Sequence, residues 1–287
     1  MHALRIGLLL LLLADSSAAE QTLLSIHTVQ PPVIDGVADD PVWSETTPIK
    51  TRDAVAGIDI ELHACHDAEN IYLLAVFPDA TENRLHKPLH WNPQMELYGM
   101  GPEREDTIVL KWAISPRKTD LSLKAASSYK ADIWYWKSVR TDPVGFADDK
   151  FQLYSENKTI KSLPIISKTG SRFYLLRRGD SGKSAYLNKI PVDYIGDIID
   201  AFEISQPDGS RADIRAKGQW QAGVWRVEFT RKLNTGNGDD IAFRPGEDYR
   251  FGVSRYEIAG RVPDPSLEIP LFGSGEVGEP LLLRFAD

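Results

Sequence analysis

Short runs of β-branched and aromatic residues, each ended by turn-forming residues, recur along this chain of 287 residues. The run at 58–64 alternates apolar and polar side chains, and an apolar run follows at 71–77 after a turn at 67–70. Further runs of this kind lie at 106–114, 131–137, 211–220, 224–230, 248–254 and 280–285. Alternation with a period of two is typical of strands that bury one face. The sequence therefore predicts an all-β fold, an immunoglobulin-like or jelly-roll-type β-sandwich with long decorated loops and at most one or two short helices.

Helical periodicity is scarce in this chain. The segment 192–202 is a candidate for one short helix, and the segment 84–104 has the composition of an irregular loop. No internal repeat of 20–50 residues and no Pro- or Ser-rich linker divides the sequence. Because all-β domains often reach about 250 residues, we expect residues 20–287 to form a single domain.

The first nineteen residues have the pattern of a secretory signal. A basic start leads into an apolar run over residues 6–14, which is too short to span a bilayer, and small residues follow at 17–19. We expect cleavage before Glu20, a periplasmic or secreted mature protein, and no membrane span.

Composition narrows the classes of partner. A net charge of −8 disfavours binding to nucleic acid. The single cysteine, Cys65, forbids an internal disulfide, so strand pairing and packing must hold the fold. Seven tryptophans and ten tyrosines predict a thick aromatic core, an aromatic-lined pocket, or both.

The sequence context does not support any of the simple metal-binding or catalytic motifs. In the run His63-Ala-Cys-His66, a strand would turn His63 and Cys65 to one side and His66 to the other. The absence of Cys-x-x-Cys-His excludes covalent c-type haem. Paired acids occur at 39–40, 148–149 and 239–240 in turn-like surroundings, which predicts solvated carboxylates rather than a glycosidase pair or a calcium site.

A motif near the mature N-terminus points to a fold. The run from Val33 to Trp43 contains Ile-Asp-Gly-x-x-x-Asp-x-x-Trp, which predicts a turn at 35–36 and a tryptophan that caps the core. This pattern resembles the opening of a β-sandwich superfamily that includes carbohydrate-binding modules.

Three later stretches of the sequence are more distinctive than the motif at 33–43. They are Gly-Pro-Glu-Arg-Glu-Asp at 101–106, the stretch 132–149 that begins Asp-Ile-Trp-Tyr-Trp-Lys, and Gly-Gln-Trp-x-x-Gly-x-Trp within 218–233. In this order they resemble the ethylbenzene-dehydrogenase-related domain, and the resemblance extends over almost the whole chain after residue 19. That family includes the haem-b subunit of periplasmic molybdenum enzymes and soluble cytochrome-like relatives. The resemblance implies a β-sandwich that binds haem b and exchanges electrons with a redox enzyme subunit or a cytochrome, without catalysis of its own.

The resemblance also implies an axial methionine and an axial lysine on the haem iron. A thioether raises the potential of the iron, and a lysine amine stays neutral only in a desolvated site. In the family the methionine lies in a Met-Gly-Asp stretch before the Trp-x-Trp-Lys strand, but the corresponding stretch here, 123–129, contains no methionine. After residues 1–19 are removed only Met95 and Met100 remain, and Met100 ranks first because it adjoins Gly101.

The other expected contacts follow from the same resemblance. Apolar and aromatic walls suit a porphyrin, and two lysines lie near the Gly-Gln-Trp-x-x-Gly-x-Trp stretch. The predicted cofactor-binding residues are Met100, Lys232, Met95, Lys217, Trp134 and Trp136, with Met100 and Lys232 on the iron, His86 and His90 as alternative nitrogen ligands, and Tyr129 as a further wall.

Three functional hypotheses remain open at this point. The first is a periplasmic haem-b-binding electron-transfer protein or subunit. The second is a non-redox carbohydrate- or small-ligand-binding module that has lost haem on the same sandwich. The third is a carboxylate-based hydrolase that uses Asp148 and Asp149.

Overall fold

The computed structural model describes residues 20–53, 56–255 and 276–286, so the predicted signal at 1–19 lies outside the described residues. Hydrogen-bonded strands follow one another in the order β10-β11-β9-β8-β7-β17-β19-β1-β3-β4-β16-β15, with β2 on β3 and β18 on β17. The bounds of these strands are β1 Gln21–His27, β2 Ile49–Asp53, β3 Ile58–His66, β4 Asn70–Pro78, β7 Thr107–Ser115, β8 Tyr129–Lys137, β9 Asp148–Ser155, β10 Leu163–Ile166, β11 Arg172–Gly179, β15 Arg215–Gln221, β16 Val224–Lys232, β17 Asp248–Arg255, β18 Glu276–Val277 and β19 Leu281–Phe285.

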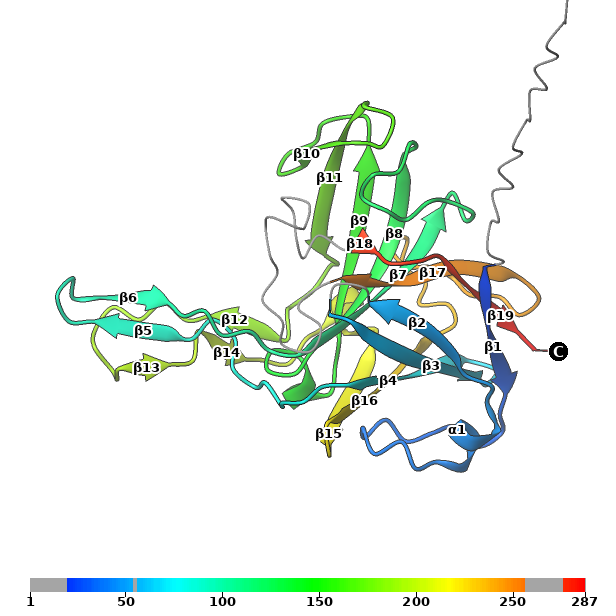
Figure 1. Ribbon diagram of the computed structural model, residues 1–287, viewed down its shortest axis with the longest axis horizontal. Helices are drawn as coiled ribbons and strands as arrows, with labels where there is room; N and C mark the ends of the chain where they lie inside the picture. The colour runs from blue at the N-terminus through cyan, green and yellow to red at the C-terminus, as the bar shows by residue number, and fades with distance from the viewer. Residues whose placement is uncertain (1–19, 54–55, 256–275, 287) are drawn as a thin grey trace, which may run out of the picture.

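This long sheet folds over on itself into two facing layers (Figure 1). Side chains at alternate positions of β8, such as Trp134 and Trp136, meet those of β16, such as Trp225 and Val227, in one large core. The period-two alternation of the sequence therefore has its expected cause, because one face of each strand points into this core. The prediction of an all-β sandwich is confirmed.

A second apolar layer covers the outer face of β7, β8 and β9. Tyr135 and Tyr154 pack there with Phe173 of β11, and the loop between β7 and β8 adds Leu121 and Leu123. Burial on both faces explains why apolar residues follow one another directly in β7 and β8, as at 108–110 and 133–136, without strict alternation with polar ones.

The helices in the described residues are short. The one α-helix there is α1, Pro41–Glu45, and two 3₁₀ turns follow, η1 at Asp142–Val144 and η2 at Gly209–Ala212. The helix predicted at 192–202 is wrong, because Gly196 adopts a positive φ and residues 198–199 pair as a strand. None of the helices in this part of the chain is long and apolar enough to span a bilayer.

A lobe, defined here as residues 85–104 and 185–205, projects from the sandwich (Figure 1). It contains the three-stranded sheet β13-β5-β6 and the pair β12-β14. The bounds are β5 Leu89–Asn92, β6 Leu97–Met100, β12 Tyr186–Asn188, β13 Ile198–Ile199 and β14 Phe202–Ile204. The expectation of an irregular loop at 84–104 is therefore wrong: the β5–β6 hairpin forms because a strand from a distant segment, β13, pairs with β5.

The N-terminal motif closes around one buried carboxylate, that of Glu228 on β16. The amides of Asp35 and Gly36 donate to Glu228 Oε2 at 3.2 and 2.7 Å, and the indole of Trp43 donates to Oε1 at 2.8 Å. Gly36 has a φ of +83°, as the predicted turn requires. Trp43 packs with Tyr72 in a small apolar cluster, so the prediction of a turn and a capping tryptophan is confirmed.

The backbone of Gly218 passes directly against the Trp136 ring. A β-carbon added at Gly218 would overlap that ring, so we expect Gly218→Ala to lower the free energy of unfolding by about 1–3 kcal/mol through overpacking. Urea denaturation would measure the loss. Gly238→Ala is the matched control, because its β-carbon would meet open space, and an equal loss in both variants would contradict this explanation.

Candidate functional site

The two candidate methionines both lie on the lobe. Met100 ends β6 and pairs with Leu89 of β5, and Met95 lies in the turn between these strands. Their exposed fractions are 68% and 64%. Both thioethers are therefore accessible to a ligand or a partner.

The candidate lysines lie in the sandwich rather than on the lobe. Lys217 of β15 donates from Nζ to the carbonyl and carboxylate oxygens of Asp142 at 3.0 and 3.2 Å. Lys232 is exposed at the end of β16, opposite Asn70 of β4. Neither lysine belongs to the segments that carry Met95 and Met100.

The candidate aromatic walls are fully buried. Trp134 and Trp136 have an exposed fraction of 0% and point into the sandwich core. Tyr129 packs on Tyr154 in the outer apolar layer and donates to backbone carbonyls of the β7–β8 loop.

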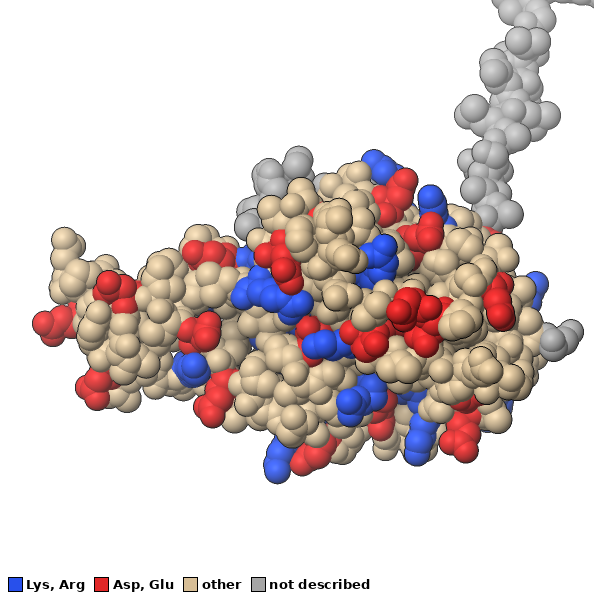
Figure 2. Space-filling view, turned by 90° about the horizontal axis from the view of Figure 1, so that it is seen from below, with Lys and Arg blue, Asp and Glu red and all other residues tan. Residues whose placement is uncertain are grey.

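Exposed apolar side chains concentrate on the lobe. Of the eighteen large apolar side chains that are exposed in the described residues, eleven belong to the lobe. They are Leu85, Met95, Leu97, Met100, Leu187, Ile190, Val192, Tyr194, Ile195, Ile198 and Ile204. Figure 2 shows the lobe as a mostly uncharged projection with scattered, mainly acidic side chains. An apolar concentration of this kind marks a site for a ligand or a partner.

Three aromatic rings meet on the same lobe. Trp91 lies edge-on to Tyr98 at 5.0 Å and to Tyr194 at 5.3 Å between ring centroids. The hydroxyl of Tyr98 donates to the Gly196 carbonyl at 2.8 Å and accepts from the Ile195 amide at 3.0 Å. These bonds tie the two segments of the lobe together.

A cavity of about 250 Å³ opens where the lobe joins the sandwich. It is smaller than the roughly 300–1,000 Å³ of pockets that enclose drug-sized ligands, so it cannot by itself surround a porphyrin. Its lining residues are Arg84, His86, Ser138, Val139, Pro143, Asp200, Ala201, Phe202 and Ile204.

The imidazole of His86 forms one wall of this cavity. Burial, followed by the nearby cations Arg140, Lys87, Arg104 and Lys137, lowers the pKa of His86 to about 2. The ring is thus neutral, and its approach to the Glu105 carboxylate at 3.4 Å is not an ion pair.

Behind the cavity lies a buried ion pair between Lys137 of β8 and Asp148 of β9. Lys137 Nζ donates to Asp148 Oδ2 and to the Tyr186 hydroxyl, the latter at 3.0 Å, while Arg211 donates to Asp148 Oδ1 at 2.9 Å. Burial lowers the pKa of Lys137 to about 8, against the opposing effect of Asp148. Burial would raise the pKa of Asp148, but Lys137, Lys150 and Arg211 outweigh burial and lower it.

The neighbours Asp148 and Asp149 do not act as a pair. Successive residues of a strand point to opposite faces, so Asp148 meets Lys137 while Asp149 lies near Asp132 and Asp240. The expectation of solvated carboxylates is wrong for Asp148, Asp149 and Asp240, which are all buried. Two carboxylates on opposite faces of a strand cannot flank one sugar bond, so this arrangement does not support the hydrolase hypothesis.

The residues of the His63–His66 run do not converge on a metal position. His63 Nδ1 contacts the Thr46 hydroxyl at 2.6 Å, and His66 Nδ1 contacts the Ser25 hydroxyl at 3.0 Å. Burial raises the pKa of Cys65 to about 12, so its thiol stays protonated.

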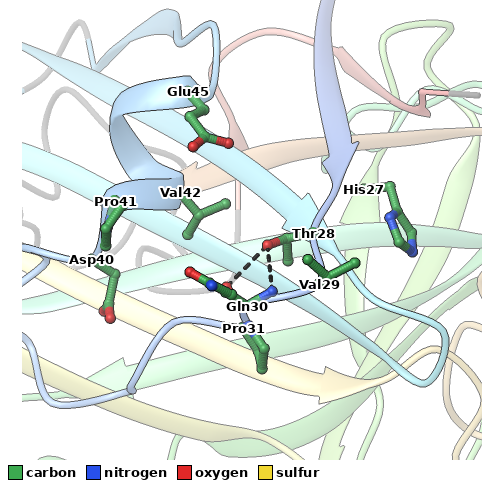
Figure 3. A pocket seen from close by; sticks show the side chains of 9 residues that line it. All are labelled: His27, Thr28, Val29, Gln30, Pro31, Asp40, Pro41, Val42 and Glu45. Carbon is green, nitrogen blue, oxygen red and sulfur yellow. Dashed lines mark hydrogen bonds between the residues drawn. The ribbon is translucent and has the colours of Figure 1, made fainter.

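A larger hollow of about 470 Å³ lies between the end of β1 and α1 (Figure 3). The hydroxyl of Thr28 and the backbone of Gln30 bond to each other on its floor. Its further lining residues are His27, Val29, Pro31, Asp40, Pro41, Val42 and Glu45. None of the predicted site residues lines this hollow.

The stretches that carry the family resemblance meet inside the sandwich. The indole of Trp225 donates to Asp106 Oδ2 at 2.9 Å. The indole of Trp136 and the amide of Gly218 both donate to Asp142 Oδ1, at 3.0 and 2.7 Å. Asp106, Trp136, Gly218 and Trp225 of these motifs therefore join strands inside the sandwich, away from the exposed apolar side chains of the lobe.

The sequence alone did not predict the exposed apolar surface of the lobe or the buried position of Lys137. The motif Trp-x-Trp-Lys already contained Lys137, and its parity opposite to Trp134 and Trp136 placed it on the outer face of the strand. The apolar residues at 187–198 were also visible, but only the pairing of β13 with β5 brings them beside the methionine hairpin.

Comparison with known proteins identifies the family. A family model described as ethylbenzene dehydrogenase matches residues 40–260. No curated protein matches the chain. Among solved structures, a carbohydrate binding module family 9 protein from Caldicellulosiruptor kristjanssonii in complex with glucose has 12% identity and a TM-score of 0.42, covering 93% of this chain and 96% of that chain. The structure of a family 9 module from the same organism with cellotriose has 13% identity and a TM-score of 0.39, covering 93% and 95%. Because the family model spans well over half of the sequence, the chain belongs to the ethylbenzene dehydrogenase family.

Proposed function

We propose that this protein is a non-catalytic, haem-b-binding electron-transfer protein or subunit that works in the periplasm beside a redox enzyme or a cytochrome. The observation that carries the proposal is the lobe, where Met95 and Met100 stand exposed among apolar side chains in a member of the ethylbenzene dehydrogenase family. The leader-like pattern at 1–19 supports export.

The methionines suit haem in both chemistry and surroundings. A thioether is a soft ligand for haem iron, and the apolar side chains of the lobe, such as Leu97 and Ile198, offer a surface for the porphyrin. When bound, haem would supply a one-electron couple whose potential a methionine ligand raises. The second axial ligand stays a prediction, because Lys217 is bonded to Asp142 and Lys232 lies away from the lobe segments.

A visible spectrum tests this function directly. Protein purified from haem-supplied cells should show a Soret band and, after reduction, the sharp bands of low-spin haem b. The absence of a Soret band, both as purified and after addition of hemin, would contradict the proposal.

Matched substitutions on one hairpin test the methionine. Met100→Leu keeps the apolar volume and removes the thioether, so we expect loss of the low-spin spectrum or a lower midpoint potential. Met95→Leu is the control, for which we expect the spectrum of the unsubstituted protein. If Met100→Leu leaves both the spectrum and the potential unchanged, Met100 is not the ligand.

A second candidate function is binding of a carbohydrate or another small ligand without haem. The observation in its favour is the trio Trp91, Tyr98 and Tyr194 on the lobe, since aromatic rings carry large contact areas. A glycan screen in which Trp91→Ala removes binding would support this function, and a screen without hits would exclude it for sugars.

A further inference from the structure

Three aspartates from distant parts of the chain converge inside the sandwich. They are Asp132 on β8, Asp149 on β9 and Asp240 in the segment before β17. One carboxylate oxygen of each lies within 4.8 Å of those of the other two. Oxygens that each lie 2.3–2.6 Å from one calcium ion are at most about 5 Å apart, so one ion can reach all three.

No donor among the described residues satisfies the carboxylate of Asp149. Its exposed fraction is 0%, and neither of its oxygens has a hydrogen-bond partner in residues 20–53, 56–255 and 276–286. Asp132 Oδ1 and Asp240 Oδ1 are buried and unpartnered as well. Buried polar atoms are nearly always bonded, so unpartnered oxygens that converge on one point indicate a missing positive group.

A fourth carboxylate, that of Asp180, stands beside this group. The Asp180 amide donates to the carbonyl oxygen of Asp149 at 3.2 Å, and both Asp180 carboxylate oxygens are buried without a partner. With Asp180 counted, six carboxylate oxygens in or beside the group of Asp132, Asp149 and Asp240 are buried without a partner among the described residues. Calcium takes 6–8 oxygen ligands, so waters or backbone carbonyls would complete a site built on the three converging oxygens.

The bonds that do exist use only the remaining oxygens of Asp132 and Asp240. Arg231 and the Ile241 amide donate to Asp132 Oδ2, and the Thr235 hydroxyl donates to Asp240 Oδ2. These donors orient the two carboxylates while their Oδ1 atoms stay unpartnered.

The charges of this cluster do not balance. Within the part of the chain that the structure describes, Arg231 is the one cation that bonds to these carboxylates. Four buried carboxylates against one cation leave three negative charges when all are ionised. Uncompensated buried charge is very costly, so the cluster must take up protons or a cation.

We propose that Asp132, Asp149 and Asp240 form a structural calcium site, with the Asp180 carboxylate beside it. Oxygen-only ligands select a hard cation. Calcium accepts several carboxylates and an irregular geometry, whereas magnesium usually keeps several waters and binds one or two carboxylates. The ion would join β8, β9 and the segment before β17. The site is separate from the lobe, so it can be tested on protein without haem.

Titration of chelator-stripped full-length protein with CaCl₂ tests the site. We expect calorimetric binding of one ion per chain and a rise in the melting temperature. Terbium should bind in the same place and emit on excitation of tryptophan, because the Trp134 ring lies 4.9 Å from the Arg231 guanidinium at the edge of the cluster.

Asp149→Asn should weaken calcium binding by at least about 100-fold, since it removes a direct ligand whereas loss of a supporting residue already costs about 10–100-fold. Glu156→Gln is the control, because Glu156 is exposed just beyond the end of β9, the strand that carries Asp149. Asp180→Asn provides a second test if Asp149→Asn folds poorly.

Two results would overturn the proposal. The first is a stripped protein that gives neither binding heat nor a higher melting temperature in millimolar CaCl₂, because shared protons then neutralise the cluster. The second is calcium binding that Asp149→Asn and Asp180→Asn both leave unchanged, because the ion would then bind elsewhere.

Discussion

Asp148→Asn should lower the free energy of unfolding by about 3–5 kcal/mol at pH 6, because the change leaves the buried ammonium of Lys137 without its carboxylate. Lys137 and Asp148 have side-chain exposed fractions of 1% and 2%. The groups that still contact the Lys137 ammonium are the Tyr186 hydroxyl at 3.0 Å and the ring of Tyr135, and neither carries a negative charge. The Glu105 carboxylate also acts on Lys137, but no hydrogen bond joins the two side chains.

The pH dependence identifies the cause of this loss. The pKa of Lys137 is lowered to about 8 in the folded protein, and removal of Asp148 lowers it further. A folded-state pKa below the unfolded value means that the folded protein binds fewer protons, so stability rises with pH in that window. Between about pH 6 and 8 the free energy of unfolding of Asp148→Asn should therefore rise, while that of the unsubstituted protein should not. The difference in free energy of unfolding between the two proteins should shrink over this range.

Urea denaturation at pH 6 and pH 8.5 measures both effects. The control is Asp59→Asn, which breaks an ion pair with Arg52 whose side chains are both 58% exposed, and it should change stability by less than about 1 kcal/mol. A loss for Asp148→Asn that is small, or that is the same at both pH values, would mean that Lys137 is not a buried ammonium.

The strands could be predicted where the alternation of side chains is local. β8 and β16 follow from their aromatic and β-branched residues alone, and the turn between β15 and β16 follows from Ala222-Gly223, which both take positive φ. β9 could not be predicted in this way, because it begins with Asp148 and Asp149 and paired acids are typical of a turn. The charge of Asp148 is tolerated in a buried strand because Lys137 of β8 and Arg211 of η2 donate to it, and these contacts are tertiary information.

The candidate site could also be predicted only where its features are local in sequence. The sequence singles out Met95 and Met100 by elimination, and the structure places both on one hairpin. It does not reveal that the segment 187–198 lies beside them, since that depends on the pairing of β13 with β5. The spacing of paired acids likewise hides the cluster of Asp132, Asp149 and Asp240. Only one member of each of the pairs 148–149 and 239–240 contributes to it, and Asp132 belongs to no pair.

Glu228→Leu should lower the free energy of unfolding by about 3–5 kcal/mol, because it leaves three buried donors without an acceptor. The amides of Asp35 and Gly36 and the indole of Trp43 all donate to this carboxylate. Glu228→Gln should cost less, about 1–3 kcal/mol, since one amide oxygen remains while the NH₂ group meets at least one donor. Urea denaturation at pH 7 gives both values.

The pH dependence separates the charge of Glu228 from its hydrogen bonds. Burial raises the pKa of Glu228 to about 6, so between about pH 4.5 and 6 the folded protein binds more protons than the unfolded chain. Stability contributed by Glu228 is therefore fully present below pH 4.5, falls as the pH rises through 6, and is constant above that value. Both substitutions should remove this fall, whereas only Glu228→Leu should cost several kcal/mol at pH 7. If Glu228→Gln is as harmful as Glu228→Leu, the ionised carboxylate itself holds the N-terminal motif, and the turn at Gly36 and the cap at Trp43 depend on charge rather than on the number of acceptors.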